Sequence, residues 1–120
     1  MTKNLDGVPK AEMFAIEYYC PVCKTRAYKS VDEYDREVYE KARKDFEEKK
    51  DELIFPRQEI PYGKEVRRLF KYHYTHFYDF FNERQLLCLS ILLQAILEIE
   101  NENVKEFMLL AFSVCLDFNN

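Results

Sequence analysis

Residues 83–99, with the sequence ERQLLCLSILLQAILEI, form the most apolar stretch of the chain. Asn82 and Gln85 have the spacing of an N-terminal capping pair, which predicts a helix from Glu83 to about Ile99. Leucines and isoleucines cover most of its circumference, and a helix that is apolar on several faces must be buried on several sides. The partner that buries it is the rest of this domain, a second copy of the chain, or a domain outside it.

A second helix is predicted directly after this one. Asn103 and Glu106 repeat the capping spacing and predict a last helix that runs to about Phe118. The short Glu100–Asn103 link makes the two helices an antiparallel hairpin. The sequence closes at Asn119-Asn120, straight after this helix, so we expect a fragment of a larger protein.

A long charged helix is predicted upstream, over about Asp32–Glu52, with Ser30 and Glu33 as its capping box. Its apolar positions are strictly four residues apart: Tyr34, Val38, Ala42 and Phe46. Its charges have the favourable i,i+4 order: Glu37 with Lys41, Glu40 with Lys44, and Asp45 with Lys49. So narrow a stripe predicts a surface helix that buries one edge. Pro56 and Pro61 stop helix formation and predict an extended connector after this helix.

The N-terminal part is short and aromatic. Met13–Tyr19 and Lys24–Lys29 predict two strands joined by a tight turn at Cys20-Pro21-Val22-Cys23. The predicted fold class is therefore mainly α, with a small N-terminal β-hairpin and CxxC knuckle, one long charged helix and a C-terminal antiparallel apolar helical hairpin. We expect a single domain over residues 1–120, in which residues 1–31 form the hairpin appendage and residues 32–120 the helical part.

The net charge, the composition and the absence of certain motifs exclude several classes of function. The net charge of −4 and the pI near 5.3 exclude a strongly basic nucleic-acid binder, so any nucleic-acid contact must come from a local patch. The chain has two glycines and no nucleophile elbow, glycine-rich cofactor loop, P-loop or metal-binding His/Glu set, so no catalytic residue is assigned. The N-terminus lacks the apolar region of a signal peptide, and no stretch has the roughly 18 apolar residues of a membrane helix. The four cysteines are then expected to be reduced, which predicts a cytoplasmic location and no membrane partner.

The sharpest local motif is Cys20-x-x-Cys23, whose spacing lets two thiolates reach one zinc ion from a tight turn. Zinc is therefore a candidate cofactor, with Cys20 and Cys23 as ligands. A structural zinc needs four ligands, however, and Cys88 and Cys115 lie alone in apolar helices, where a cysteine is usually a small core residue. A vestigial turn, or a half-site completed elsewhere, is favoured over a complete zinc site. A redox motif is disfavoured because no helix N-terminus follows Cys20 to lower its pKa.

A basic helical face is predicted between Gly63 and Tyr72. Lys64, Arg67, Arg68 and Lys71 follow i, i+3, i+4, i+7 spacing, and aromatic residues surround them: Tyr62, Phe70, Tyr72 and Tyr74. A basic stripe edged by aromatics can contact phosphates and stack on bases. The alternative is a solvated face that pairs with the acidic residues of the long helix. His73 and His76, three residues apart, could face one metal in a helix, but rings packed within the aromatic cluster are favoured.

Four short motifs occur in order along the chain from about Glu17 onward: Tyr18-x-Cys20-Pro21-x-Cys23, Tyr74-Thr75-His76-Phe77, the stretch from Phe81 to Ser90 around Arg84-Gln85-Leu86-Leu87, and the closing Leu116-Asp117-Phe118-Asn119-Asn120. Together they resemble a segment of adenine-specific DNA methylases that contains a zinc-ribbon-like part. Two residues depart from the family pattern, because Phe77 replaces a tryptophan and Lys24 replaces a glycine.

The resemblance implies a parent enzyme that transfers a methyl group from S-adenosylmethionine to adenine in DNA. The family's cofactor motif lies upstream and its catalytic motif downstream of this region, and neither occurs in this chain. The chain then corresponds to the insert between them, which commonly holds target recognition. On this interpretation Arg67, Arg68 and Lys71 contact phosphates, His76, Arg84 and Gln85 form a polar site, and Tyr74 or Phe77 holds extruded DNA. The alternative is a structural module whose apolar hairpin docks onto the parent's other domains or dimerises.

Overall fold

A computed structural model describes residues 11–118 of the chain, so Met1–Lys10 and Asn119–Asn120 lie outside the described residues. The elements follow in the order β1 (Ala15–Cys20), β2 (Thr25–Ser30), α1 (Glu33–Lys49), α2 (Arg67–Lys71), a 3-10 turn η1 (Phe77–Phe80), α3 (Glu83–Leu97) and α4 (Glu102–Phe118). The described part is mainly helical with a small N-terminal hairpin, as the sequence predicts. None of its helices is long and apolar enough to cross a membrane.

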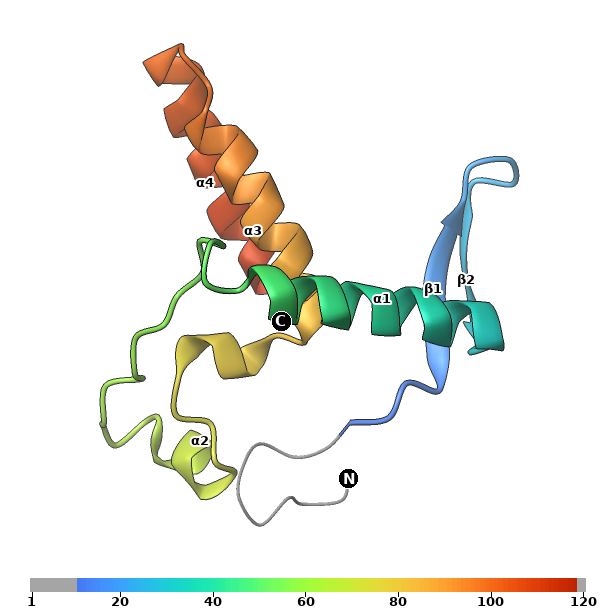
Figure 1. The fold of residues 1–120 in the computed structure, drawn as a ribbon, viewed down its shortest axis with the longest axis horizontal. Coiled ribbons are helices and arrows are strands. Elements are labelled where there is room, and N and C mark those ends of the chain that lie inside the picture. The colour runs from blue at the N-terminus through green and yellow to red at the C-terminus, as the bar shows by residue number, and fades with distance from the viewer. Residues whose placement is uncertain (1–10, 119–120) are drawn as a thin grey trace.

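The molecule is open rather than compact. Figure 1 shows α1 as a central bar, with the α3–α4 hairpin projecting from one end and the β1–β2 hairpin lying beside the other. The radius of gyration is 16.8 Å, whereas about 13–14 Å is expected for a compact domain of this length. Much of the apolar surface that the sequence predicts to be buried is therefore exposed in this chain.

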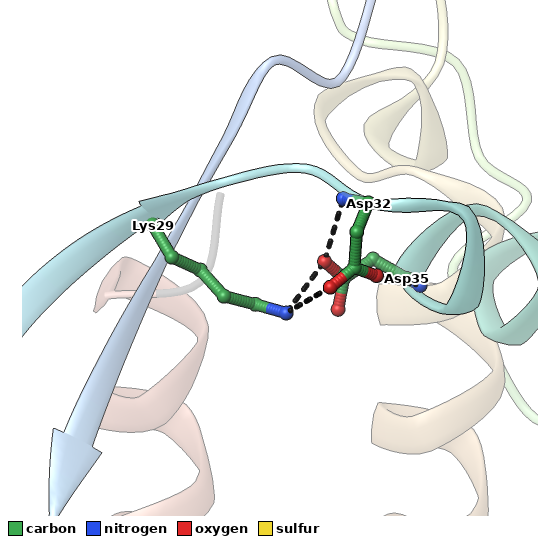
Figure 2. Close-up of polar contacts among 3 residues, drawn as sticks. All are labelled: Lys29, Asp32 and Asp35. Carbon is green, nitrogen blue, oxygen red and sulfur yellow. Dashed lines mark hydrogen bonds and ion pairs between the residues drawn. The ribbon is translucent and has the colours of Figure 1, made fainter.

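The first turn of α1 is held by Asp32, not by Ser30. The Asp35 N–H donates to Asp32 Oδ1 at 3.0 Å, and Asp35 Oδ2 accepts from the Asp32 N–H at 3.1 Å. The predicted Ser30–Glu33 capping box is wrong because Ser30 is still paired with Ala15 in the hairpin. Lys29 Nζ lies 3.1 Å from Asp32 Oδ2 and 2.7 Å from Asp35 Oδ2, so it ties the end of β2 to the start of α1 (Figure 2). The two Asp groups raise the pKa of Lys29, with Asp35 the larger cause.

The buried face of α1 differs from the predicted stripe. Tyr34 is 71% and Val38 43% exposed, whereas Tyr39 and Ala42 are half-buried and Phe46 is only 6% exposed. An α-helix turns once in 3.6 residues, so a strict four-residue spacing drifts around the helix by about 40° per step. The helix ends at Lys49 and not at Glu52 as predicted. The ion pairs along it have i,i+3 spacing and not the predicted i,i+4 spacing: Arg43 pairs with Glu40, and Lys50 pairs with Glu47.

The core lies where α1 crosses α3. Phe46 packs with Leu86 and Leu87, which are 6% and 7% exposed, and half-buried apolar residues surround these three: Ala42, Leu53, Phe55, Tyr78 and Phe81. The ring centroids of Phe46 and Phe55 are 5.5 Å apart, so the connector after α1 folds back over the same cluster. Aromatic and leucine side chains at one crossing thus hold together three segments of the chain.

The C-terminal helices form the predicted antiparallel hairpin (Figure 1). Asn82 and Gln85 cap α3 as predicted, with both reciprocal hydrogen bonds at 2.9 Å. The predicted Asn103–Glu106 cap is wrong, because α4 begins at Glu102 and its Val104 N–H donates to Asn101 Oδ1 at 3.1 Å.

The hairpin is much less buried than its composition predicts. Its α4 helix contains no buried residue. Cys88 is exposed and Cys115 half-buried, so neither is the core residue that the sequence predicts.

The predicted helix from Lys64 to Tyr72 is shorter in the structure. Lys64–Val66 form a turn, α2 covers Arg67–Lys71, and His73 then takes a left-handed backbone with φ of 65°. A bridge between Glu59 and His76 follows, with the Ile60 N–H donating to the Thr75 carbonyl at 2.8 Å. This bridge closes residues 60–75 into a loop that presents α2.

We predict that Phe46→Ala destabilises the chain by about 3–5 kcal/mol, because it removes a buried ring and leaves a cavity at the α1–α3 crossing. Chemical denaturation followed by circular dichroism measures this change. Tyr34→Ala, on an exposed position of the same helix, is the matched control and should cost no more than about 0.5 kcal/mol. Equal effects of the two substitutions would contradict the placement of the core.

Candidate nucleic-acid interface

The α2 loop gathers four basic side chains. Arg67, Arg68 and Lys71 are exposed on α2, and Lys64 is exposed in the turn before it. Together with Glu65 and Phe70 they line one shallow depression. The predicted basic face is therefore assembled, although by a turn and a five-residue helix rather than by one longer helix. Glu65 contributes the one negative charge to the lining of this depression.

These four cations are not neutralised by the acidic helix. Within residues 11–118, no ion pair involves Lys64, Arg67, Arg68 or Lys71. The alternative in which they pair with the carboxylates of α1 is therefore wrong for the described chain. The geometric reason is that the 60–75 loop carries α2 away from α1, whose ion pairs are formed within its own helix and at its two ends (Figure 1). The basic group keeps its charges available for an anionic partner.

The predicted aromatic border is divided between packed and exposed rings. Tyr62 is 74% exposed, and its ring lies 5.6 Å from that of Phe70, which lines the basic depression. Tyr74 is half-buried and stacks on Phe80 at 5.6 Å with an interplanar angle of 16°. Tyr62 is thus the ring with an open face beside the basic group, whereas Tyr74 supports the loop.

His76 shapes the loop by capping η1. The backbone N–H of His76 donates to Asp79 Oδ2 at 2.9 Å. The imidazole Nδ1 lies 2.9 Å from Thr75 Oγ1, and the ring stacks on Tyr78 with the ring centroids 4.9 Å apart. His73 and His76 do not share a helical face, because the chain between them is not helical. The favoured interpretation, rings packed in an aromatic cluster, describes His76.

Arg84 and Gln85 lie in a different place from the basic group. They line a hollow of about 440 Å³ with Glu12, Met13 and Tyr39, between the start of α3 and the N-terminal segment. Gln85 Oε1 accepts the Asn82 N–H in the helix cap, whereas Arg84 is exposed. The structure therefore does not bring all the predicted nucleic-acid residues together.

Sequence reasoning missed one polar contact at this second hollow. The Tyr39 hydroxyl donates to Glu83 Oε2 at 2.8 Å, which links α1 to the first turn of α3. Burial, and then the Glu83 carboxylate, raises the pKa of Tyr39 to about 12. No sequence signal could have found this pair, because its members are 44 residues apart.

A third hollow, of about 380 Å³, is an apolar groove between the connector and the helical hairpin. Phe55, Phe81, Leu93 and Phe112 are among its lining residues. Ser90 also lines it and is 2% exposed, and its hydroxyl has no hydrogen-bond partner among the described residues.

The Cys20-x-x-Cys23 turn joins the two strands as predicted. Cys23 Sγ lies 3.1 Å from Thr25 Oγ1, and this contact, followed by one with Cys20, lowers the pKa of Cys23. Lys24 takes a left-handed backbone with φ of 54°, a conformation that favours glycine. Within residues 11–118, no three His, Cys, Asp or Glu side chains are grouped to hold a metal ion, and zinc binding stays a prediction.

No protein-family model, curated protein sequence or solved structure matches the chain. The resemblance to adenine-specific DNA methylases therefore depends on the quoted motifs alone.

We predict that Tyr39 ionises near pH 12. Burial, and then the contact with Glu83, hold the folded pKa of Tyr39 above the unfolded value near 10, so the protonated side chain contributes stability that is fully present below pH 10 and is lost between pH 10 and about 12. Tyrosinate absorbance, titrated in the wild type and in Tyr39→Phe, measures this. The difference between the two curves should have its midpoint near pH 12, and a midpoint near pH 10 would contradict the contact.

Proposed function

We propose that this chain is a non-catalytic segment of an adenine-specific DNA methyltransferase that contacts DNA through Arg67, Arg68, Lys71 and Lys64. One observation carries the proposal, namely that four adjacent basic side chains have no ion-pair partner in the described chain. An acidic protein that keeps such a group unpaired holds a local site for an anion despite its net charge of −4.

A DNA backbone fits this group better than a small anion. Duplex DNA presents one negative charge per about 1.7 Å of axis, so several adjacent exposed cations can each approach a different phosphate. The depression is shallow and open, and it has no enclosed pocket for a single ligand. Tyr62, exposed beside Phe70, supplies a ring on which an unpaired base can stack.

The other predicted residues take supporting roles in this proposal. His76 and Tyr74 hold the loop that presents α2, through the η1 cap and the stack on Phe80. Arg84 is exposed at the second hollow and is assigned a separate contact, with DNA or with the catalytic domain of the parent. S-adenosylmethionine and the methyl-transfer chemistry belong to parts of the parent enzyme that carry the cofactor and catalytic motifs.

Anisotropy of labelled duplex and single-stranded DNA, titrated with the chain across a salt series, tests this proposal. We predict that binding weakens steeply with salt, and that Arg67→Glu/Arg68→Glu lowers affinity at least about tenfold and reduces the salt slope by about two units for duplex DNA. Lys41→Glu/Lys44→Glu, which makes the same change of charge on exposed positions of α1, is the matched control.

The two variants separate a local site from bulk charge. Loss of binding in the α2 variant alone supports the proposal. An equal loss in both variants, or no binding by the wild type at low salt, overturns it.

A further inference from the structure

The outer face of α4 carries an apolar stripe that nothing in the described chain covers. It consists of Val104, Phe107, Ala111, Val114 and Phe118, in 3-4-3-4 spacing. Val104 is 48%, Phe107 74%, Val114 57% and Phe118 84% exposed. This spacing is that of the a and d positions of a coiled coil, which place apolar side chains along one seam.

The stripe is distinct from the face that α4 turns toward α3. Phe112 and Leu116 are half-buried and line the apolar groove together with Leu89 and Leu93 of α3. With about 100° per residue, Phe112 and Leu116 lie roughly a third of a turn or more from the stripe. The α3–α4 contact therefore leaves the stripe free, and α4 has one apolar face more than its own hairpin uses.

The exposed area is that of a protein interface. Given that an aromatic side chain can bury about 150–250 Å², Phe107 and Phe118 alone present on the order of 300 Å². Val104 and Val114 are 48% and 57% exposed and bring the stripe to on the order of 400 Å² of apolar surface, within the range of patches that mark interaction sites on soluble proteins.

The stripe is complementary to itself in an antiparallel register. When two copies are centred on Ala111, Phe107 of one copy lies beside Val114 of the other, and Val104 lies beside Phe118. Each phenylalanine ring then packs against a smaller valine. Ala111, the smallest side chain of the stripe, lies at the two-fold axis, where the helices approach most closely. No charged residue occurs from Phe107 to Leu116, so like charges do not oppose this pairing.

We propose that α4 is a homodimer interface, in which the stripe from Val104 to Phe118 packs antiparallel against the same stripe of a second copy of this chain. The two hairpins then form a four-helix arrangement that buries the faces left open in one copy. This inference concerns a surface other than the basic group of α2 and does not depend on DNA binding.

Sedimentation equilibrium over a range of concentrations tests the proposal with the full chain. We predict a mass of about twice 14.6 kDa for the wild type and a monomer for Phe107→Glu, because the substitution places a charge in an apolar seam. Ser113→Glu, at an exposed position on the opposite side of α4, is the matched control and should stay dimeric. Circular dichroism checks that both variants keep their helices, which is expected because both positions are exposed.

Cysteine crosslinking tests the antiparallel register. With the four native cysteines changed to serine, Ala111→Cys should form a disulfide between copies, whereas Phe118→Cys should not, because its two copies would lie about 20 Å apart. Efficient crosslinking at both positions would show a parallel pair and overturn the register. A monomeric wild type at all concentrations, or a dimer that Phe107→Glu leaves intact, would overturn the interface itself.

Discussion

The contact of Phe46 with Leu86 and Leu87 is the constraint on which the rest of this structure depends. It fixes the angle at which α1 crosses α3, and the Phe55 ring then brings the connector back over the same place. The Tyr39–Glu83 hydrogen bond fastens the same two helices toward the other end of α1. Since few other apolar side chains are buried among the described residues, the remaining elements extend outward from this crossing instead of enclosing it.

The parts of the fold that sequence predicts well are those decided locally. The Asn82–Gln85 cap needs only four consecutive residues, and the apolar run after it can form little except a helix. The caps that were misplaced had competitors a residue or two away. Ser30–Glu33 and Asp32–Asp35 both have the required spacing, and strand pairing of Ser30 decides between them. Ser30 pairs with Ala15, which is 15 residues earlier in the chain, so a capping pattern of four consecutive residues carries no information about this pairing.

The candidate site shows the same division between local and distant information. The spacing of Arg67, Arg68 and Lys71 predicts that they share a surface, and they do. Whether the carboxylates of α1 neutralise them depends on the Glu59–His76 bridge and on where the loop then points, which no spacing reveals. The sequence also could not predict how much of α3 and α4 is buried. An apolar helix needs a packing partner, but its sequence does not show whether that partner is part of the same chain.

Because the packing is concentrated at one crossing, the structure is expected to open in stages. Backbone amides in the middle of α1 and in the first turns of α3 are held by the only sizeable cluster among the described residues, so their exchange with solvent requires unfolding of that cluster. The β1–β2 hairpin is joined to it through Lys29 and the first turn of α1 (Figure 2), and the far end of the α3–α4 hairpin lies outside this cluster. These two arms can fray separately while the crossing stays intact, which gives one short chain several regions of different local stability.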